Sequence, residues 1–313
     1  MQVIDVINKI PYDNSPITLV IGKFDGIHKG HQAVLKAAKN WMDPDEESLA
    51  VLSFSNSSTC FLSQQDEYRQ GITSESEKLL LLKSIGVSRY YRMQFTKESS
   101  VNTAESFILE HLARLNIKRL VVGEGFRFGE GDSKGMDQLI RLCKKMHIVV
   151  TIVRHLKENG KKISSSSIRN WIKEGLMEPV HSSLGRPFSI QAEVVHGKKL
   201  GRTLNFPTIN LGKTEDVVMP KPGVYLGTAG IYQGEKIKEY WSVLISAGYR
   251  PVVNGKDYLV EAHLLNYTGD LYGKKVTVAF HRFLREERPF ADLDSLVIQM
   301  KIDKEEAEKL LGV

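Results

Sequence analysis

Residues 22–32 read Gly22-Lys23-Phe24-Asp25-Gly26-Ile27-His28-Lys29-Gly30-His31-Gln32 and connect a strand-like apolar run, 17–21, to an amphipathic helical pattern. The apolar residues of that pattern follow helical spacing, at Val34, Ala37, Ala38 and Trp41. Three glycines let backbone amides approach a ligand closely, and a helix N-terminus presents unpaired N–H groups and a partial positive charge. The stretch therefore predicts a phosphate site between a strand and a helix.

The two histidines of this stretch admit more than one interpretation. His28 and His31 stand one helical turn apart and would face the same bound group. Asp25, His28 and His31 could instead be three ligands of a metal such as zinc, and a His-x-x-His pair also arises from ordinary surface composition. The turn holds no fourth ligand, and Cys60 and Cys143 stand far from it. Phosphate is favoured, although spacing alone leaves the metal open.

Length and composition indicate a two-domain globular protein with anionic partners. A chain of 313 residues exceeds a usual single core, and its net charge of +6 suits nucleotides, RNA or an acidic surface. The basic residues are scattered among 37 acidic ones, so nucleic-acid binding is not required. Two unpaired cysteines and an N-terminus without an apolar leader predict a cytoplasmic location, and no apolar run is long enough to span a membrane.

The first half alternates predicted strands and helices. Apolar runs at 49–54, 120–122 and 148–153 join 17–21 as strands. Helices are predicted after His31, after a capping box at 74–77, after Asn102, and over 136–146. This alternation is typical of a parallel sheet covered on both faces, in which ligands bind beyond the carboxyl ends of the strands.

The stretch 22–32 resembles the nucleotide-binding signature of the bacterial bifunctional riboflavin kinase/FAD synthetase family, within the His-x-Gly-His nucleotidylyltransferases. The resemblance implies a Rossmann-like domain that transfers an adenylyl group from ATP, with His28 and His31 stabilising the triphosphate as pyrophosphate departs. Such chemistry needs positioning and electrostatic stabilisation more than a covalent nucleophile. The resemblance also implies nucleotide-binding roles for Gly22, Lys23, Phe24, Asp25, Gly26 and Gly30.

A second segment of the first half reads Ile163-Ser164-Ser165-Ser166-Ser167-Ile168-Arg169. By itself it could be a polar linker with a helix cap. It resembles the Ile-Ser-Ser-Thr-x-Ile-Arg signature that completes the triphosphate site in this superfamily. The resemblance implies that Ser164, Ser165 and Arg169 bind the nucleotide.

Three segments depart from the family pattern, and all belong, by resemblance, to the side that receives FMN. Residues 54–58 lack the usual proline and histidine, residues 95–100 lack the usual Phe-Asn-x-x-Phe-Ala, and Gly125 stands where an aspartate is usual. Phe126 and Phe128 of the third segment are expected beside the flavin. We therefore hypothesise that ATP binding is kept while FMN adenylylation is slowed or restricted to an unusual form of the flavin.

The second half changes to the patterns of β-structure. After a boundary region at 178–183, runs at 190–196, 224–231, 240–245, 258–265 and 276–283 alternate with turn residues, which predicts a small antiparallel barrel. Two terminal helices are predicted at 292–301 and 304–311. The predicted domains are 1–183 and 184–313.

Residues 197–210 run from Gly197 to Asn210 and could be only a basic hairpin loop. They resemble the riboflavin kinase signature Gly-Arg-x-x-Gly-Phe-Pro-Thr-x-Asn, with Asn205 in place of a glycine. The resemblance implies a flap over the ATP phosphates and two oxygen ligands for Mg²⁺, an ion that prefers such donors. Gly197, Lys199 and Gly201 would form the flap, and Thr208 and Asn210 would bind the metal.

The run 259–265 places Glu261 and His263 on one strand face, which could be a solvent-facing pair. It resembles the family segment with the catalytic glutamate, so Glu261 would be the base for the riboflavin 5′-hydroxyl. The run 284–290 resembles a segment that places Arg285 beside the flavin. Ser246 and Asn266 stand where family members usually have Asn and Asp.

The resemblance thus implies an enzyme that uses ATP to phosphorylate riboflavin to FMN and then to adenylylate FMN to FAD. Two alternatives remain at this stage. One is a kinase whose N-terminal domain is mainly a scaffold, or adenylylates only an unusual flavin form. The other is a flavin-responsive regulator that binds RNA through its positive charge.

Overall fold

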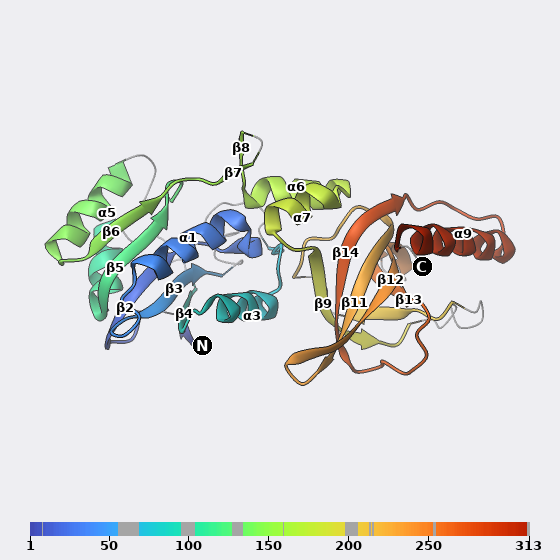
Figure 1. The fold of residues 1–313 in the computed structure, drawn as a ribbon, viewed down its shortest axis with the longest axis horizontal. Coiled ribbons are helices and arrows are strands. Elements are labelled where there is room, and N and C mark those ends of the chain that lie inside the picture. Colours follow the sequence, from blue (N-terminus) through green and yellow to red (C-terminus); the bar gives the residue numbers. More distant parts are fainter. Residues whose placement is uncertain are drawn as a thin grey trace. The chain divides into compact units, whose positions relative to one another are not determined.

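The computed structural model describes residues 1–7, 9–55, 69–94, 104–126, 134–158, 160–197, 206–212, 214, 216–252 and 255–311. The chain forms two compact units, which Figure 1 shows as an α/β sheet and a β-barrel. The first comprises Met1–Gly71 with Glu75–Ser165, and the second comprises Ile72–Ser74 with Ser166–Val313.

Six parallel strands form the sheet of the first unit, in the order β1-β4-β3-β2-β5-β6. Their bounds are β1 (Gln2–Val6), β2 (Asp13–Ile21), β3 (Ser48–Phe54), β4 (Arg89–Met93), β5 (Leu115–Gly123) and β6 (Val149–Val153). The sequence predicts β2, β3, β5 and β6 but neither β1 nor β4. Strand β4 reads Arg-Tyr-Tyr-Arg-Met, which carries no apolar run, yet both of its tyrosines are fully buried.

Helices cover both faces of this sheet, as the alternating pattern predicts. Side chains alternate along each strand, so Val20 and Val51 pack with Leu35 and Leu82 on one face. On the other face, the neighbouring strand residues pack with side chains such as Ile108. The helices are α1 (Lys29–Trp41) and α3 (Glu75–Ile85) on the first face, and α4 (Ala104–Glu110) and α5 (Lys134–Lys145) on the second.

The chain reverses direction across the sheet at β2. From β2 it proceeds to β3 on one side, and β5 returns to pair with β2 on the other side. Such a reversal opens a crevice beyond the carboxyl end of the central strand. The loop that begins at Gly22 follows that strand end directly, and the N–H of Gly22 donates to the carbonyl of Leu52 at 3.1 Å.

Two helices occupy the region where the sequence predicts a boundary segment at 178–183. They are α6 (Ser165–Glu174), which precedes this segment, and α7 (Met177–Leu184), which makes residues 178–183 helical. Gly175 and Gly185 end them with φ of 78° and 73°, which other residues rarely adopt. Val180 and Leu184 are buried, and α7 packs on the barrel. The compact units divide at residue 165, whereas 183 remains the boundary predicted for the domains.

The second unit is a closed barrel with the strand order β10-β13-β12-β11-β14-β9, all paired antiparallel. Its strands are β9 (Phe188–Val195), β10 (Ile209–Gly212), β11 (Gly223–Gln233), β12 (Lys236–Val252), β13 (Gly255–Leu264) and β14 (Lys275–Arg285). The sequence predicts all of these except β10. That strand spans four residues, too few for alternation to be recognised.

A single helix, α9 (Leu293–Leu311), ends the described chain, so the prediction of two terminal helices is wrong. Asp303 lies between the two predicted helices, and it is 3 % exposed and faces inward. Its carboxylate accepts hydrogen bonds from Nε and Nη2 of Arg285 at 2.8 and 2.7 Å, and one from Gln299 at 2.7 Å. The helix continues because this carboxylate has partners on β14. Among the described helices, none is long and apolar enough to cross a membrane.

We predict that Asp303→Ala lowers the free energy of unfolding by about 2–3 kcal/mol, because it leaves Arg285 without its bidentate partner. Denaturant unfolding followed by tryptophan fluorescence measures the change. Glu308→Gln is the control on the same helix, since it removes only the partly exposed pair with Lys304 and costs less than about 0.5 kcal/mol. Equal effects of the two substitutions would contradict the role given to Asp303.

Candidate active sites

The loop after β2 has an unusual backbone. Phe24, Gly26 and Ile27 have positive φ values of 51°, 80° and 40°. Two of these residues carry side chains that disfavour this conformation, and such local strain concentrates at functional sites. Phe24 and Ile27 are nevertheless buried, at 1 % exposed each, so packing against the sheet holds them in place.

The first histidine caps the helix that follows the loop. The backbone N–H of His31 donates to Nδ1 of His28 at 3.3 Å. A neutral imidazole whose Nδ1 accepts a hydrogen bond carries its proton on Nε2, so Nε2 of His28 is left as a donor. A Cβ atom at Gly30 would lie 3.0 Å from two atoms of the His28 ring, which explains the glycine between the histidines.

The two imidazole rings are stacked, with centroids 3.7 Å apart and planes 16° apart. Burial, the charge on His28 and the charge on Lys78 lower the pKa of His31 well below its ordinary value. Two stacked rings avoid carrying positive charge together in the absence of an anion. His31 is therefore neutral near pH 7 and suited to donating a hydrogen bond to phosphate.

The described residues contain no cluster of three or more His, Cys, Asp or Glu side chains that could hold a metal ion. Asp25, His28 and His31 all lie within this described part of the chain. Their arrangement disfavours the zinc interpretation that spacing left open.

The serine-rich segment meets the histidine loop, although 140 residues separate them. The hydroxyl of Ser165 donates to the carbonyl of Asp25 at 3.0 Å, and Ser164 precedes it directly. Ser165, the first residue of α6, therefore lies beside the loop. Arg169 lies on α6 and is 2 % exposed. Lys23 is held through its carbonyl, which accepts from the hydroxyl of Ser53 at 3.0 Å.

The altered flavin-side segments lie mostly outside the described residues, as does Phe128. Phe126 is described and packs partly buried against the sheet core. A Cβ atom at Gly125 would lie 2.7 Å from Cε1 of His155 and 3.0 Å from Nζ of Lys162. The ends of two basic side chains thus occupy the space that an aspartate at this position would need.

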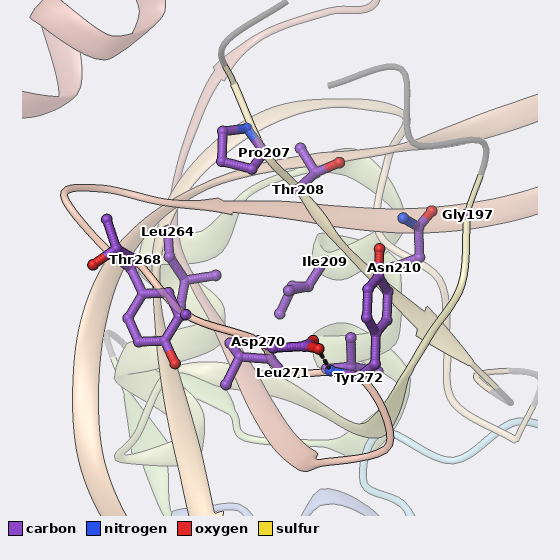
Figure 2. Close-up of a pocket in the computed structure, with 13 residues that line it drawn as sticks. Gly197, Pro207, Thr208, Ile209, Asn210, Leu264, Thr268, Asp270, Leu271 and Tyr272 are labelled. Carbon is purple, nitrogen blue, oxygen red and sulfur yellow. Dashed lines mark hydrogen bonds between the residues drawn. The ribbon is translucent and has the colours of Figure 1, made fainter. Parts of the chain in front are cut away.

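The barrel carries a cavity of about 340 Å³ beside β10. Figure 2 shows Thr208 on one side of it and Asp270 and Tyr272 on the opposite side. The carboxylate of Asp270 accepts from the N–H of Tyr272 at 3.0 Å, and this bond fixes the turn that forms the wall. The lining includes Gly197, Thr208 and Asn210, whereas Lys199 and Gly201 lie outside the described residues.

Strand register brings the predicted kinase residues together. Asn210 on β10 pairs with Glu261 on β13, and Glu261 pairs with Ser246 on β12. Cross-strand partners project to the same side of a sheet, so a carboxylate, an amide and a hydroxyl lie in one row. A Cβ atom at Gly197 would lie 2.4 Å from Nδ2 of Asn210, so only glycine fits there.

Arg285 has a different set of contacts from those expected for a flavin-binding residue. Besides its two bonds to Asp303, its Nη1 donates to the carbonyl of Glu286 at 3.0 Å. All three guanidinium nitrogens are therefore engaged in this structure. Sequence reasoning missed Asp303, because an aspartate in a helical pattern ordinarily faces water. The cavity wall 267–272 is likewise absent from the predicted site residues.

The fold defines a class of protein, in which an α/β domain with a six-stranded parallel sheet precedes a closed six-stranded antiparallel barrel. Comparison with known proteins identifies the family. Residues 10–167 match the family model described as FAD synthetase, and residues 184–311 match the one described as riboflavin kinase. The chain belongs to the bifunctional riboflavin kinase/FMN adenylyltransferase family.

Relatives match over nearly the whole chain. The bifunctional riboflavin kinase/FMN adenylyltransferase of Bacillus subtilis (strain 168) is 30% identical, over 95% of this chain and 93% of its own length. The Escherichia coli (strain K12) relative of the same description is 33% identical, over 94% and 93%. A crystal structure described as a macrolide-efflux protein from Streptococcus pneumoniae superimposes with a TM-score of 0.83 at 27% identity, covering 96% of this chain and 97% of the other.

We predict that His31 remains neutral at pH values where an ordinary histidine is charged. Its ring nitrogens, followed by ¹⁵N NMR from about pH 7 downward, should keep neutral shifts below about pH 6. The unfolded chain binds the proton that the folded chain excludes, so this site lowers stability as pH falls below about 6.5. A His31 that titrates at or above its ordinary pKa would contradict the prediction.

Proposed function

We propose that this chain makes FAD from riboflavin in two ATP-dependent steps. In the first, the 5′-hydroxyl of riboflavin attacks the γ-phosphorus of ATP, which gives FMN and ADP. In the second, a phosphate oxygen of FMN attacks the α-phosphorus of ATP, which gives FAD and pyrophosphate. The observation that carries the proposal is that two separate units, each matching one of the two family models, present polar groups suited to a polyphosphate.

The row of Asn210, Glu261 and Ser246 in the barrel supports the riboflavin kinase step. Glu261 is the base that takes the proton from the riboflavin hydroxyl, and Asn210 beside it and Thr208 offer oxygen donors for Mg²⁺. Their hydroxyl and amide oxygens suit a hard cation that keeps most of its ligands from water and phosphate. When bound, Mg²⁺ would offset the negative charge of the ATP phosphates. Gly197 leaves room for Asn210, and the cavity beside β10 would hold ATP.

The histidine loop supports the adenylyl step. Nε2 of His28, fixed as a donor by the helix cap, and the neutral His31 ring would stabilise the charge that moves onto the bridging oxygen as pyrophosphate leaves. Gly22, Phe24, Gly26 and Gly30 shape the backbone that approaches the phosphates. Ser164, Ser165 and Arg169 stay predicted phosphate ligands, and so does a cytoplasmic location for the protein.

A time course of riboflavin with ATP and magnesium, with products resolved by chromatography, tests the whole proposal. FMN should appear first and FAD should follow with release of pyrophosphate. The proposal fails if neither flavin nucleotide forms.

We predict that Glu261→Gln lowers the rate of riboflavin phosphorylation by at least about 100-fold, because it keeps the shape and removes the base. The same variant should still convert supplied FMN to FAD, which provides an internal control for folding. Glu235→Gln, in the exposed turn between β11 and β12, should keep the wild-type rate. Phosphorylation by Glu261→Gln at the wild-type rate would remove Glu261 from the mechanism.

The hypothesis that FMN adenylylation is slowed or restricted to an unusual flavin form concerns the part of the first domain that receives FMN. Its support is the set of altered residues at 54–58, 95–100 and 125, of which Gly125 lies beside two basic side chains. Phe126 and Phe128 stay predicted flavin contacts, as does Arg285 in the barrel.

We predict slower FAD formation from oxidised FMN in aerobic buffer than from chemically reduced FMN under nitrogen, because the altered segments belong, by resemblance, to the side that receives FMN. Stopped-time assays of both reactions at equal ATP measure the ratio, and riboflavin phosphorylation provides the reference rate. Equal rates with the two redox forms would show that the altered segments do not restrict the acceptor.

A further inference from the structure

A lysine ammonium is buried next to the histidine loop. Lys78, in the first turn of α3, is 1 % exposed. Helix α3 packs against the short turn Asp25–Ile27 that leads into His28. Burial of an ammonium is costly unless a partner offsets it, so the position of Lys78 requires an explanation.

One carboxylate holds this ammonium in place. Oε2 of Glu75 lies 3.2 Å from Nζ of Lys78, and Oε1 lies 3.6 Å from Nη1 of Arg92. Arg92 in turn pairs with Asp5 at 2.6 Å. The four charges sum to zero, so the network is balanced before any ligand binds.

A buried tyrosine ties this network to the loop. The hydroxyl of Tyr90 donates to Glu75 and shares a hydrogen bond with Ser53, and burial followed by the charge of Glu75 raises the pKa of this hydroxyl. Ser53 donates to the carbonyl of Lys23 at 3.0 Å. Tyr90 and Ser53 are both fully buried. The arrangement is therefore a built network between α3, the strand ends and the loop, not a chance surface pair.

The charge of the ammonium acts on the second histidine. The charge on Lys78 contributes to lowering the pKa of His31, after burial and His28. Nδ1 of His31 is buried, and within the described part of the chain it has no hydrogen-bond partner. An ammonium has three N–H donors, and the ion pairs of the described residues give Lys78 one partner, Glu75. Donor capacity of the ammonium thus remains beside the site proposed for the triphosphate.

We propose that Lys78 binds the polyphosphate of ATP in the adenylyl-transfer site and neutralises the pyrophosphate as it leaves. The proposal rests on the adenylyl transfer proposed above. The bond that forms joins the FMN phosphate oxygen to the α-phosphorus, and the bond that breaks joins the α-phosphorus to the bridging oxygen. The electron pair goes to pyrophosphate. Lys78 keeps its proton and acts as a fixed charge.

Glu75 acts as a positioning residue for the ammonium of Lys78. It holds the ammonium where a lysine side chain would otherwise bend toward water. A compact point charge suits phosphate oxygens, and the ion pair with Glu75 offsets the cost of burial until the nucleotide arrives.

The test compares Lys78→Met, Lys78→Arg and the exposed control Lys83→Met on the same helix. Each variant is assayed for FMN adenylylation over a range of MgATP, for inhibition by added pyrophosphate, and for riboflavin phosphorylation as an internal reference. Methionine fits a buried site without charge, so Lys78→Met should fold, and its thermal unfolding is measured alongside.

We expect Lys78→Met to lower kcat/KM for MgATP in adenylylation by about 100-fold and to weaken inhibition by pyrophosphate, while riboflavin phosphorylation is unchanged. Lys78→Arg should recover most of the loss, because it keeps the charge, and Lys83→Met should match the wild type.

Wild-type adenylylation and pyrophosphate inhibition in Lys78→Met would overturn the role of Lys78. A loss of rate with unchanged pyrophosphate inhibition would also overturn it, since the residue would then act only on structure. If the wild-type protein itself forms no FAD from FMN, the proposed adenylyl transfer fails, which is a different result from either of these.

Discussion

One hydrogen bond, from the backbone N–H of His31 to Nδ1 of His28, sets the geometry of the first unit's site. It caps α1, selects the tautomer of His28, and keeps the two rings stacked at 3.7 Å. A side chain at position 30 would push the His28 ring away, so Gly30 is needed to keep this hydrogen bond and the stacking of the two rings. The strained backbone at Phe24 and Ile27 persists because both side chains are buried under the sheet, where they resist relaxation.

In the barrel, strand register sets the geometry of the candidate site. Glu261 lies in one row with Asn210 and Ser246 only while β10, β13 and β12 keep their pairing. A slip of one residue would turn Glu261 to the opposite face, because side chains alternate along a strand. Closure of the barrel opposes such a slip, since every strand has two neighbours. The row of Asn210, Glu261 and Ser246 therefore depends on the pairing of the whole barrel rather than on the short strand β10 alone.

Each unit also ties a helix to its sheet through an ion pair. In the first unit Glu75 on α3 pairs with Arg92 on β4 at 3.6 Å, and the same carboxylate pairs with the buried Lys78 on its own helix. In the second, the anion Asp303 is buried and Arg285 is partly exposed. Buried pairs add little net stability, but loss of one partner leaves a charge that cannot be solvated. Both pairs thus hold a helix in one arrangement close to residues that the family resemblance assigns to nucleotide or flavin.

The sequence by itself determined the strand, loop and helix around residues 22–32, the β-rich second half, and the strand face shared by Glu261 and His263. These follow from local periodicity, glycines and caps, which act over a few residues. Tertiary structure alone decided that α9 continues through Asp303, that Lys78 is buried, and that Ser165 meets Asp25. Asp303 and Ser165 find their partners, Arg285 and Asp25, far away in the chain. Lys78 pairs with Glu75 one turn earlier, and it is buried because α3 packs against the turn before His28. No local pattern records these contacts between distant segments.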